Sequence, residues 1–272
     1  MQVSSLVVLQ DGTLASGSVD LTIWNTTTGL NIKTLRGHTK LVWTLALFPD
    51  GSLASGGQDG TIRIWNTTSG NTINILSGNN DFVRSSLALP DGNTLAVGHQ
   101  DFNIRFWNKN TGVLIRTLTG HKDIVSRFAI LPDGSLASAG QCDLSIKIWN
   151  INTGQLIRTL TGHMGCIYGL LVLPDGTLAS AAESDQTIKI WNTNTGQNLK
   201  TLKGNSAFYD LAFLPDGYLA VASQPNIAIW DINNNKSIKT LAGHTQWVTS
   251  LALLPDGSLA SGSADSTVRI WN

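Results

Sequence analysis

Residues 37–66 read GHTKLVWTLALFPDGSLASGGQDGTIRIWN, and variants of this stretch recur along the whole chain. Every copy ends on Trp-Asn or Trp-Asp, with steps of 41, 42, 42, 42, 39 and 41 residues between Trp24, Trp65, Trp107, Trp149, Trp191, Trp230 and Trp271. A repeat of roughly 40 residues indicates an architecture that stacks one supersecondary unit. Because no linker interrupts the repeat, the sequence predicts a single domain.

The unit that begins at residue 37 predicts four short strands. Runs rich in β-branched and apolar residues occupy 42–48, 52–56, 61–66 and 72–76, and tight-turn signals separate them. Strands this short, joined by such turns, form an antiparallel meander. Both faces of the sheet are apolar, because Ile62 and Ile64 point one way and Trp65 the other. Radial stacking of sheets covers both faces, as in a β-propeller.

The predicted fold class is all-β, a seven-bladed β-propeller of four-stranded antiparallel blades whose last blade lacks its outer strand. The third strand of that blade, 267–271, is expected to be an open edge available for strand pairing with another chain. Residues 2–6 match residues 247–251, so the sequence is expected to be a fragment cut within a unit. The blades are expected at about residues 1–36, 37–77, 78–119, 120–161, 162–203, 204–242 and 243–272.

Three recurring features resemble those of the WD40 repeat family: Gly-His before the first strand, Asp in the turn between the second and third strands, and the closing Trp-Asn or Trp-Asp. The resemblance covers the whole chain. It implies a propeller in which the recurring Gly-His, Asp and Trp residues are structural. It also implies that partners contact the narrow (top) face of the ring.

Four units carry a complete set of His, Ser, Asp and Trp. In the second unit, the ring of His38 is expected to bridge Asp59 and Ser55, while the indole N–H of Trp65 reaches the same hydroxyl. The resemblance implies that these tetrads are structural; Ser, His and Asp also invite a hydrolase interpretation, but an active site is normally unique. The four tetrads are His38, Ser55, Asp59, Trp65; His121, Ser138, Asp143, Trp149; His163, Ser180, Asp185, Trp191; and His244, Ser261, Asp265, Trp271.

The third and sixth units lose the tetrad in the same way. Asn79 and Asn205 replace the histidine, and Val97 and Val221 replace the serine. We expect these two blades to be held by apolar packing instead.

Composition argues against several function classes. Eighteen basic and eighteen acidic residues cancel, so no overall field favours nucleic acid or an anionic membrane. Cys142 and Cys166 are too few for a disulfide framework. They fall on adjacent blades near the same end of the ring, where a contact is possible, but ordinary free thiols in a reducing cytoplasm are expected. No metal-spaced cluster, phosphate loop or unique nucleophile–base pair is present, so no catalytic residue, metal or cofactor is predicted. His99 is the only histidine outside the Gly-His pairs that precede a first strand, and it is expected to be an exposed loop residue.

Strand alternation places a set of variable residues beside the narrow end of the ring. Aromatic residues with an arginine on such a rim have the composition of an interaction hot spot. The sequence therefore favours a non-catalytic scaffold that binds a peptide or protein partner on the top face; the alternative is an architectural or sensor domain of a larger regulatory protein with no peptide site. The candidate partner-binding residues are Leu41, Trp43, Gln58, Phe82, Arg84, Gln100, Tyr168, Tyr209 and Trp247.

Overall fold

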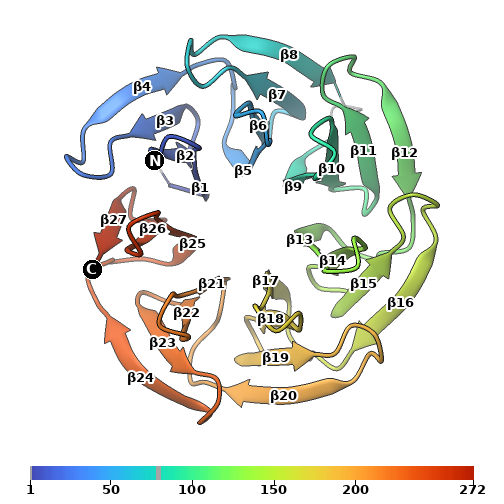
Figure 1. The fold of residues 1–272 in the computed structure, drawn as a ribbon, viewed down its shortest axis with the longest axis vertical. Helices are drawn as coiled ribbons and strands as arrows, with labels where there is room; N and C mark the ends of the chain where they lie inside the picture. Colours follow the sequence, from blue (N-terminus) through green and yellow to red (C-terminus); the bar gives the residue numbers. More distant parts are fainter. Residues whose placement is uncertain (1, 78–80) are drawn as a thin grey trace.

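The computed structural model describes residues 2–77 and 81–272, and within them 27 strands form seven antiparallel sheets around a central axis (Figure 1). Six sheets hold four consecutive strands each, and the seventh holds three. In each blade the first strand is innermost, and in the four-stranded blades the fourth lies at the rim (Figure 1). The predicted fold class, including the three-stranded last blade, is confirmed.

The strands follow one another in every blade without a crossover. The first three blades contain β1 (Ser5–Val8), β2 (Leu14–Gly17), β3 (Leu21–Trp24), β4 (Asn31–Leu35); β5 (Val42–Leu47), β6 (Leu53–Gly57), β7 (Thr61–Trp65), β8 (Thr72–Ser77); β9 (Val83–Ala88), β10 (Thr94–His99), β11 (Ile104–Asn108) and β12 (Leu114–Leu118). The next two contain β13 (Val125–Ile130), β14 (Leu136–Gly140), β15 (Ser145–Trp149), β16 (Leu156–Thr161); β17 (Ile167–Val172), β18 (Leu178–Ala182), β19 (Thr187–Trp191) and β20 (Asn198–Lys203). The last two contain β21 (Asp210–Phe213), β22 (Leu219–Ala222), β23 (Ile227–Asp231), β24 (Lys236–Leu241); β25 (Val248–Leu253), β26 (Leu259–Ser263) and β27 (Val268–Trp271).

Apolar side chains from both faces of a blade are buried against its two neighbours. Ile62 and Ile64 of β7 pack in one cluster with Val83 and Leu95 of the third blade. Trp65 belongs instead to the cluster shared with the first blade. The two-faced pattern of the third strand therefore explains why the sheets stack around a ring.

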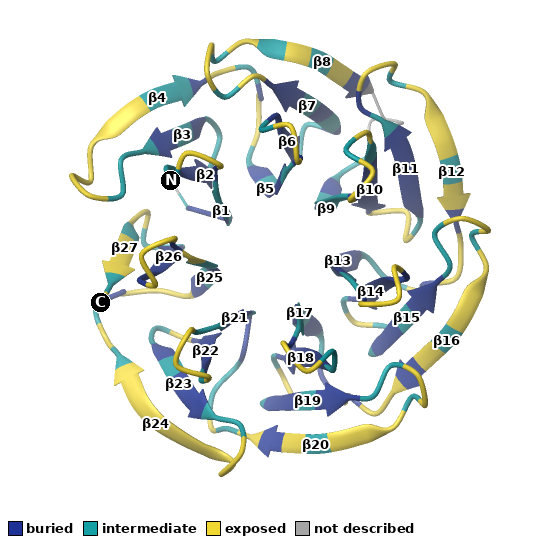
Figure 2. Cartoon of the chain, viewed as in Figure 1, coloured by how far each residue is buried: buried dark blue, intermediate teal, exposed yellow. Residues whose placement is uncertain are grey.

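The second strands are buried along their length, whereas the outer strands are largely exposed (Figure 2). Small residues permit this burial: a Cβ added to Gly56 of β6 would lie 2.2 Å from Cγ1 of Val83 in the next blade. In the described part of the chain, no helix is long and apolar enough to cross a membrane.

In the described residues, the seventh and first blades close the ring without sharing a strand. The backbone N–H of Val3 donates to the carbonyl of Ser263 at 3.0 Å, and the Thr249 hydroxyl donates to the carbonyl of Val3 at 2.5 Å. Val3 also packs in an apolar cluster with Leu254. Side-by-side packing thus joins the first and last blades.

Candidate functional site

The second blade brings its predicted tetrad together in a buried relay. The Nδ1 atom of His38 lies 2.9 Å from Oδ2 of Asp59, and Nε2 lies 2.7 Å from Oγ of Ser55. The indole N–H of Trp65 donates to the same Oγ at 2.7 Å. A neutral imidazole with its proton on Nδ1 satisfies every donor and acceptor in this relay of hydrogen bonds. The relay ties the entry loop, the second strand and the third strand of the blade to one another.

The other three tetrads have the same geometry. The corresponding His Nε2–Ser Oγ distances are 2.7, 2.6 and 2.7 Å, and each indole N–H lies 2.8 Å from its hydroxyl. The serine side chains are fully buried, so a substrate cannot reach these hydroxyls. Hydrogen bonds from His121 and from the backbone N–H of Lys122 outweigh burial and hold the pKa of Asp143 well below its usual range. Four such sets fit a structural role better than hydrolysis.

The third blade is held differently, as its altered residues predict. Val97 is fully buried within an apolar cluster. Asp101 pairs with Arg105, and the buried indole N–H of Trp107 has no hydrogen-bond partner in the described part of the chain. Asn79 lies outside the described residues.

His99 is not exposed, contrary to the sequence-based expectation. It ends β10 with none of its surface accessible, and neither ring nitrogen has a hydrogen-bond partner among the described residues. Burial, with a contribution from the Arg105 charge, lowers the pKa of His99 to about 4. The expectation failed because the histidine was placed in a loop, whereas β10 extends through it into the core.

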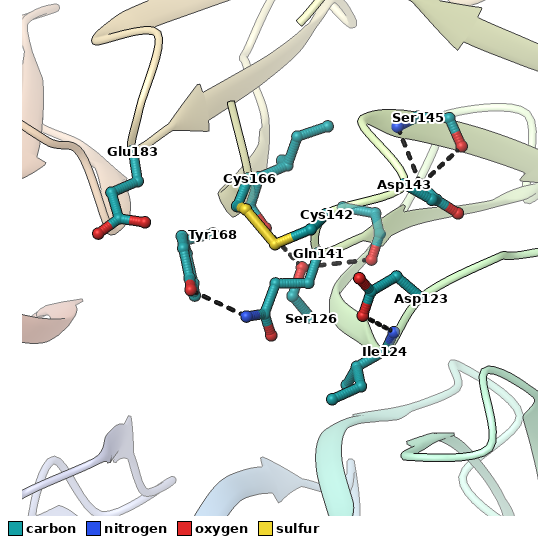
Figure 3. Close-up of a disulfide and its surroundings, with 12 residues drawn as sticks. Asp123, Ile124, Ser126, Gln141, Cys142, Asp143, Ser145, Cys166, Tyr168 and Glu183 are labelled. Carbon is teal, nitrogen blue, oxygen red and sulfur yellow. Dashed lines mark hydrogen bonds between the residues drawn. A yellow bond between two sulfur atoms is a disulfide. The ribbon is translucent and has the colours of Figure 1, made fainter. Parts of the chain in front are cut away.

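Cys142 and Cys166 form a disulfide, so the prediction of free thiols was wrong (Figure 3). Cys142 follows β14 in the fourth blade, and Cys166 precedes β17 in the fifth. The backbone N–H of Ile167 donates to the carbonyl of Gln141 at 2.7 Å, which brings the two segments side by side. The cysteine pair therefore gives no argument for a reducing compartment.

The top face is the end of the ring that carries the turns between second and third strands, such as residues 58–60. A cavity of about 300 Å³, which we call the top-face cup, opens there. It brings together five of the nine predicted partner-binding residues, Trp43, Arg84, Tyr168, Tyr209 and Trp247. Its other lining residues are Gln2, Ser4, Arg127, Glu183 and Thr249.

The remaining four predicted residues do not line the cup. They pair with one another through the backbone: the N–H of Gln58 donates to the carbonyl of Leu41 at 2.8 Å, and that of Gln100 to the carbonyl of Phe82 at 3.1 Å. These pairs lie on the top side of the second and third blades.

A β-bulge at the top end of the first strand aims several side chains at the cup. In the second blade Val42 pairs with Gly57 and Thr44 with Gly56, so Trp43 between them has no pairing partner. The same irregularity leaves Arg84 unpaired in the third blade and Tyr168 in the fifth. Bulges redirect side chains in this way. In all three blades the bulged residue is the fifth after the position of the Gly-His histidine, so the sequence count identified it. The count missed Arg127, which directly follows the bulged Ser126 in β13.

Aromatic rings form part of the cup lining. Tyr209 stacks on Trp247 with centroids 5.8 Å apart and tilts against Tyr168 at 5.7 Å. The Tyr209 hydroxyl donates to Oε1 of Glu183 at 3.2 Å, and Tyr168 accepts a hydrogen bond from Gln141 at 2.9 Å. Figure 3 shows the second of these bonds beside the disulfide. Burial and the charge of Glu183 raise the pKa of Tyr209 to about 12, so this hydroxyl remains a donor at neutral pH.

Two arginines add positive charge to the same cup. The guanidinium of Arg84 lies over the Trp43 ring, 4.6 Å from its centroid, in a cation–π contact. Burial, together with repulsion from Arg127, lowers the pKa of Arg84 to about 10, so it stays charged at neutral pH. Arg127 of the fourth blade approaches Asp210 of the sixth, with Nε 3.9 Å from Oδ1. Burial raises the pKa of Asp210, which also accepts the backbone N–H of Leu251 at 2.8 Å.

The comparisons with known proteins agree with this geometry. A family model described as "WD domain, G-beta repeat" (WD40) matches residues 29–66, 70–108, 112–150, 154–192 and 235–272, more than half of the chain. Each matched segment ends one residue after the tryptophan of a third strand. No curated protein matches the chain. Among the described residues, no cluster of three or more His, Cys, Asp or Glu side chains is arranged to hold a metal ion.

Proposed function

The chain belongs to the WD40 repeat family, and on this premise we propose that it is a non-catalytic scaffold that binds an extended segment of a protein partner in the top-face cup. The observation that carries the proposal is the convergence of Trp43, Arg84, Tyr168, Tyr209 and Trp247, from five blades, on one cavity. Tryptophan, tyrosine and arginine in a concave site are typical of interaction hot spots. A volume of about 300 Å³ accommodates a few side chains of a bound segment.

Simultaneous substitution of Trp43, Arg84 and Tyr168 by alanine tests this proposal. We expect at least about tenfold weaker binding to a partner identified by pull-down, because hot-spot side chains contribute most of the affinity at such sites. The measurement is isothermal titration calorimetry with the purified partner.

The matched control substitutes alanine for three exposed apolar residues of the outer strands, Ile115, Ile157 and Leu199. This variant should bind the partner normally. Equal affinity in both variants would contradict the proposal and favour the alternative, an architectural or sensor domain without a peptide site.

We also propose that the outer edge of the seventh blade accepts an extended strand from a partner chain. In the described part of the chain, β27 pairs only with β26. A cavity of about 710 Å³ lies beside it, and its lining includes Ile238, Leu241, Leu259 and Trp271. A strand with one open edge next to an apolar cavity fits strand addition, in which backbone hydrogen bonds and side-chain pockets act together.

Lys239 supports this second contact. It borders the same cavity from β24. At the corresponding place in the fifth blade, Lys200 donates to the carbonyl of Asn233 in the sixth blade at 3.0 Å. Arg158 in the fourth blade donates likewise to the carbonyl of Asn194 at 2.8 Å. Lys239 is therefore placed to bind carbonyls of a segment that docks beside β27.

A synthetic peptide with the sequence of residues 153–161, which includes an outer strand of this protein, tests the edge. At ten times its dissociation constant, the peptide should raise the free energy of unfolding by about 1.4 kcal/mol, measured as a higher melting temperature. The same peptide with proline in place of its central residue should have no effect, because proline cannot donate to the strand ladder. An unchanged melting temperature with the unmodified peptide would refute strand addition at this edge.

A further inference from the structure

We propose that the top-face cup selects its partner segment by a single carboxylate side chain, from Asp or Glu, that binds the guanidinium of Arg84. The inference rests on the proposed function and adds the chemistry of the ligand. It concerns the positive charge of Arg84, which no described residue compensates.

In the part of the chain that the structure describes, no carboxylate or other acceptor pairs with Arg84. Within the described residues it forms neither a hydrogen bond nor an ion pair, and its one specific contact is the cation–π contact with Trp43. A guanidinium carries five N–H donors in its plane, and stacking on an indole leaves the edges of that plane free. These edges match the two oxygens of a carboxylate in a bidentate pair, which is among the stronger polar contacts in proteins.

The neighbouring charges do not neutralise Arg84. Arg127 lies close enough to repel it and is itself compensated by Asp210. Glu183 borders the cup but is not within ion-pair distance of Arg84, and its carboxylate accepts the Tyr209 hydroxyl. Among the described residues that line the cup, Arg84 is therefore the cation left unpaired for an incoming ligand.

This charge arrangement favours a carboxylate over a phosphate. A single negative charge on the ligand would compensate Arg84 and relieve its repulsion with Arg127. A phosphate group carries close to two negative charges at neutral pH, and the second charge would meet Glu183 in the same small cavity. Flanking residues of the segment would cover the aromatic surface of Tyr168, Tyr209 and Trp247.

A random nine-residue peptide library displayed on phage is the first test, with the whole chain as bait. Peptides selected by the wild-type protein should share Asp or Glu at one position, and selection with Arg84→Glu should replace it by Lys or Arg. Arg36→Glu makes the same charge change at a side chain that is 80 % exposed and outside the cup, and it should leave the acidic preference intact. Melting curves of both variants establish that they are folded.

A selected peptide then gives the quantitative test by calorimetry. Replacing its acidic residue by Asn or Gln should weaken binding at least about tenfold, because a charge-assisted bidentate pair is lost. Replacing it by phosphoserine should give no gain in affinity. Combining Arg84→Glu with a lysine at that peptide position should restore binding.

The outcomes separate the two proposals. Selected peptides that bind in the cup without an acidic preference, or with one that Arg84→Glu leaves unchanged, would overturn the carboxylate assignment and leave the scaffold proposal standing. Tighter binding of the phosphoserine peptide would also overturn it. If the library yields no peptide that depends on Trp43 and Tyr168, both proposals fail.

Discussion

Replacement of His121 by alanine is expected to lower the free energy of unfolding by about 3 kcal/mol, because it removes the central member of a buried relay. The His121 ring lies 2.7 Å from Asp143 Oδ2 and 2.7 Å from Ser138 Oγ. Without it, the carboxylate and the hydroxyl each lose a partner inside a blade that excludes water, and the space of the ring is left empty. Urea unfolding followed by tryptophan fluorescence measures the loss.

Lys122 provides the control, since its exposed side chain adjoins the same histidine. Lys122→Ala should change the free energy of unfolding by less than about 0.5 kcal/mol. A His121→Ala protein as stable as the wild type would contradict the structural role of the tetrad. Loss of a hydrolytic rate in a variant of unchanged stability would assign the tetrad to catalysis instead.

The fold was predictable because its determinants repeat within each unit. In the second unit the predicted strands 42–48 and 61–66 differ by one residue from β5 and β7. The turn residues and the apolar residues on both faces of the third strand determine structure locally. Because they recur at the same positions in each unit, the repeat settles the strand assignment even where one copy alone is ambiguous. Tetrad members could be identified for the same reason.

The cup was only partly predictable because some of its lining residues lie outside the positions that the repeat singles out. Counting five positions from each histidine, or from the asparagine that replaces it, identified the bulged residues Trp43, Arg84 and Tyr168, yet the count missed Arg127 and Glu183. Arg127 directly follows a bulged residue, and Glu183 lies in a turn that carries one residue more than the corresponding turn of the second unit. The cup is also assembled between blades, where the periodicity of a single unit gives no information.

The disulfide shows the same limitation. Cys142 and Cys166 are 24 residues apart and belong to different units, so spacing within one unit does not relate them. They meet because the turn after β14 lies beside the start of β17, as the backbone hydrogen bond from Ile167 to Gln141 shows. Position within the ring, rather than the count of cysteines, was the available signal.

Reduction of this disulfide is expected to lower the free energy of unfolding by about 3 kcal/mol, because the unfolded chain would lose a cross-link that closes a loop of intermediate length. Cys142 is exposed, so dithiothreitol can reach the bond. The measurement is urea unfolding with and without the reductant. A Cys142→Ser, Cys166→Ser double variant should show the lower stability in both conditions and no response to dithiothreitol.

Reduction should also act on the cup, because the disulfide supports one of its walls. Gln141 directly precedes Cys142, and its side chain donates to the Tyr168 hydroxyl at 2.9 Å. Freeing this turn would let Tyr168 lose its orienting partner, so a cup ligand should bind more weakly to the reduced protein while the tetrads stay intact. Alkylation of the denatured, unreduced protein tests for the disulfide on which both effects depend. Modification of both cysteines would contradict the disulfide, and modification of neither would confirm it.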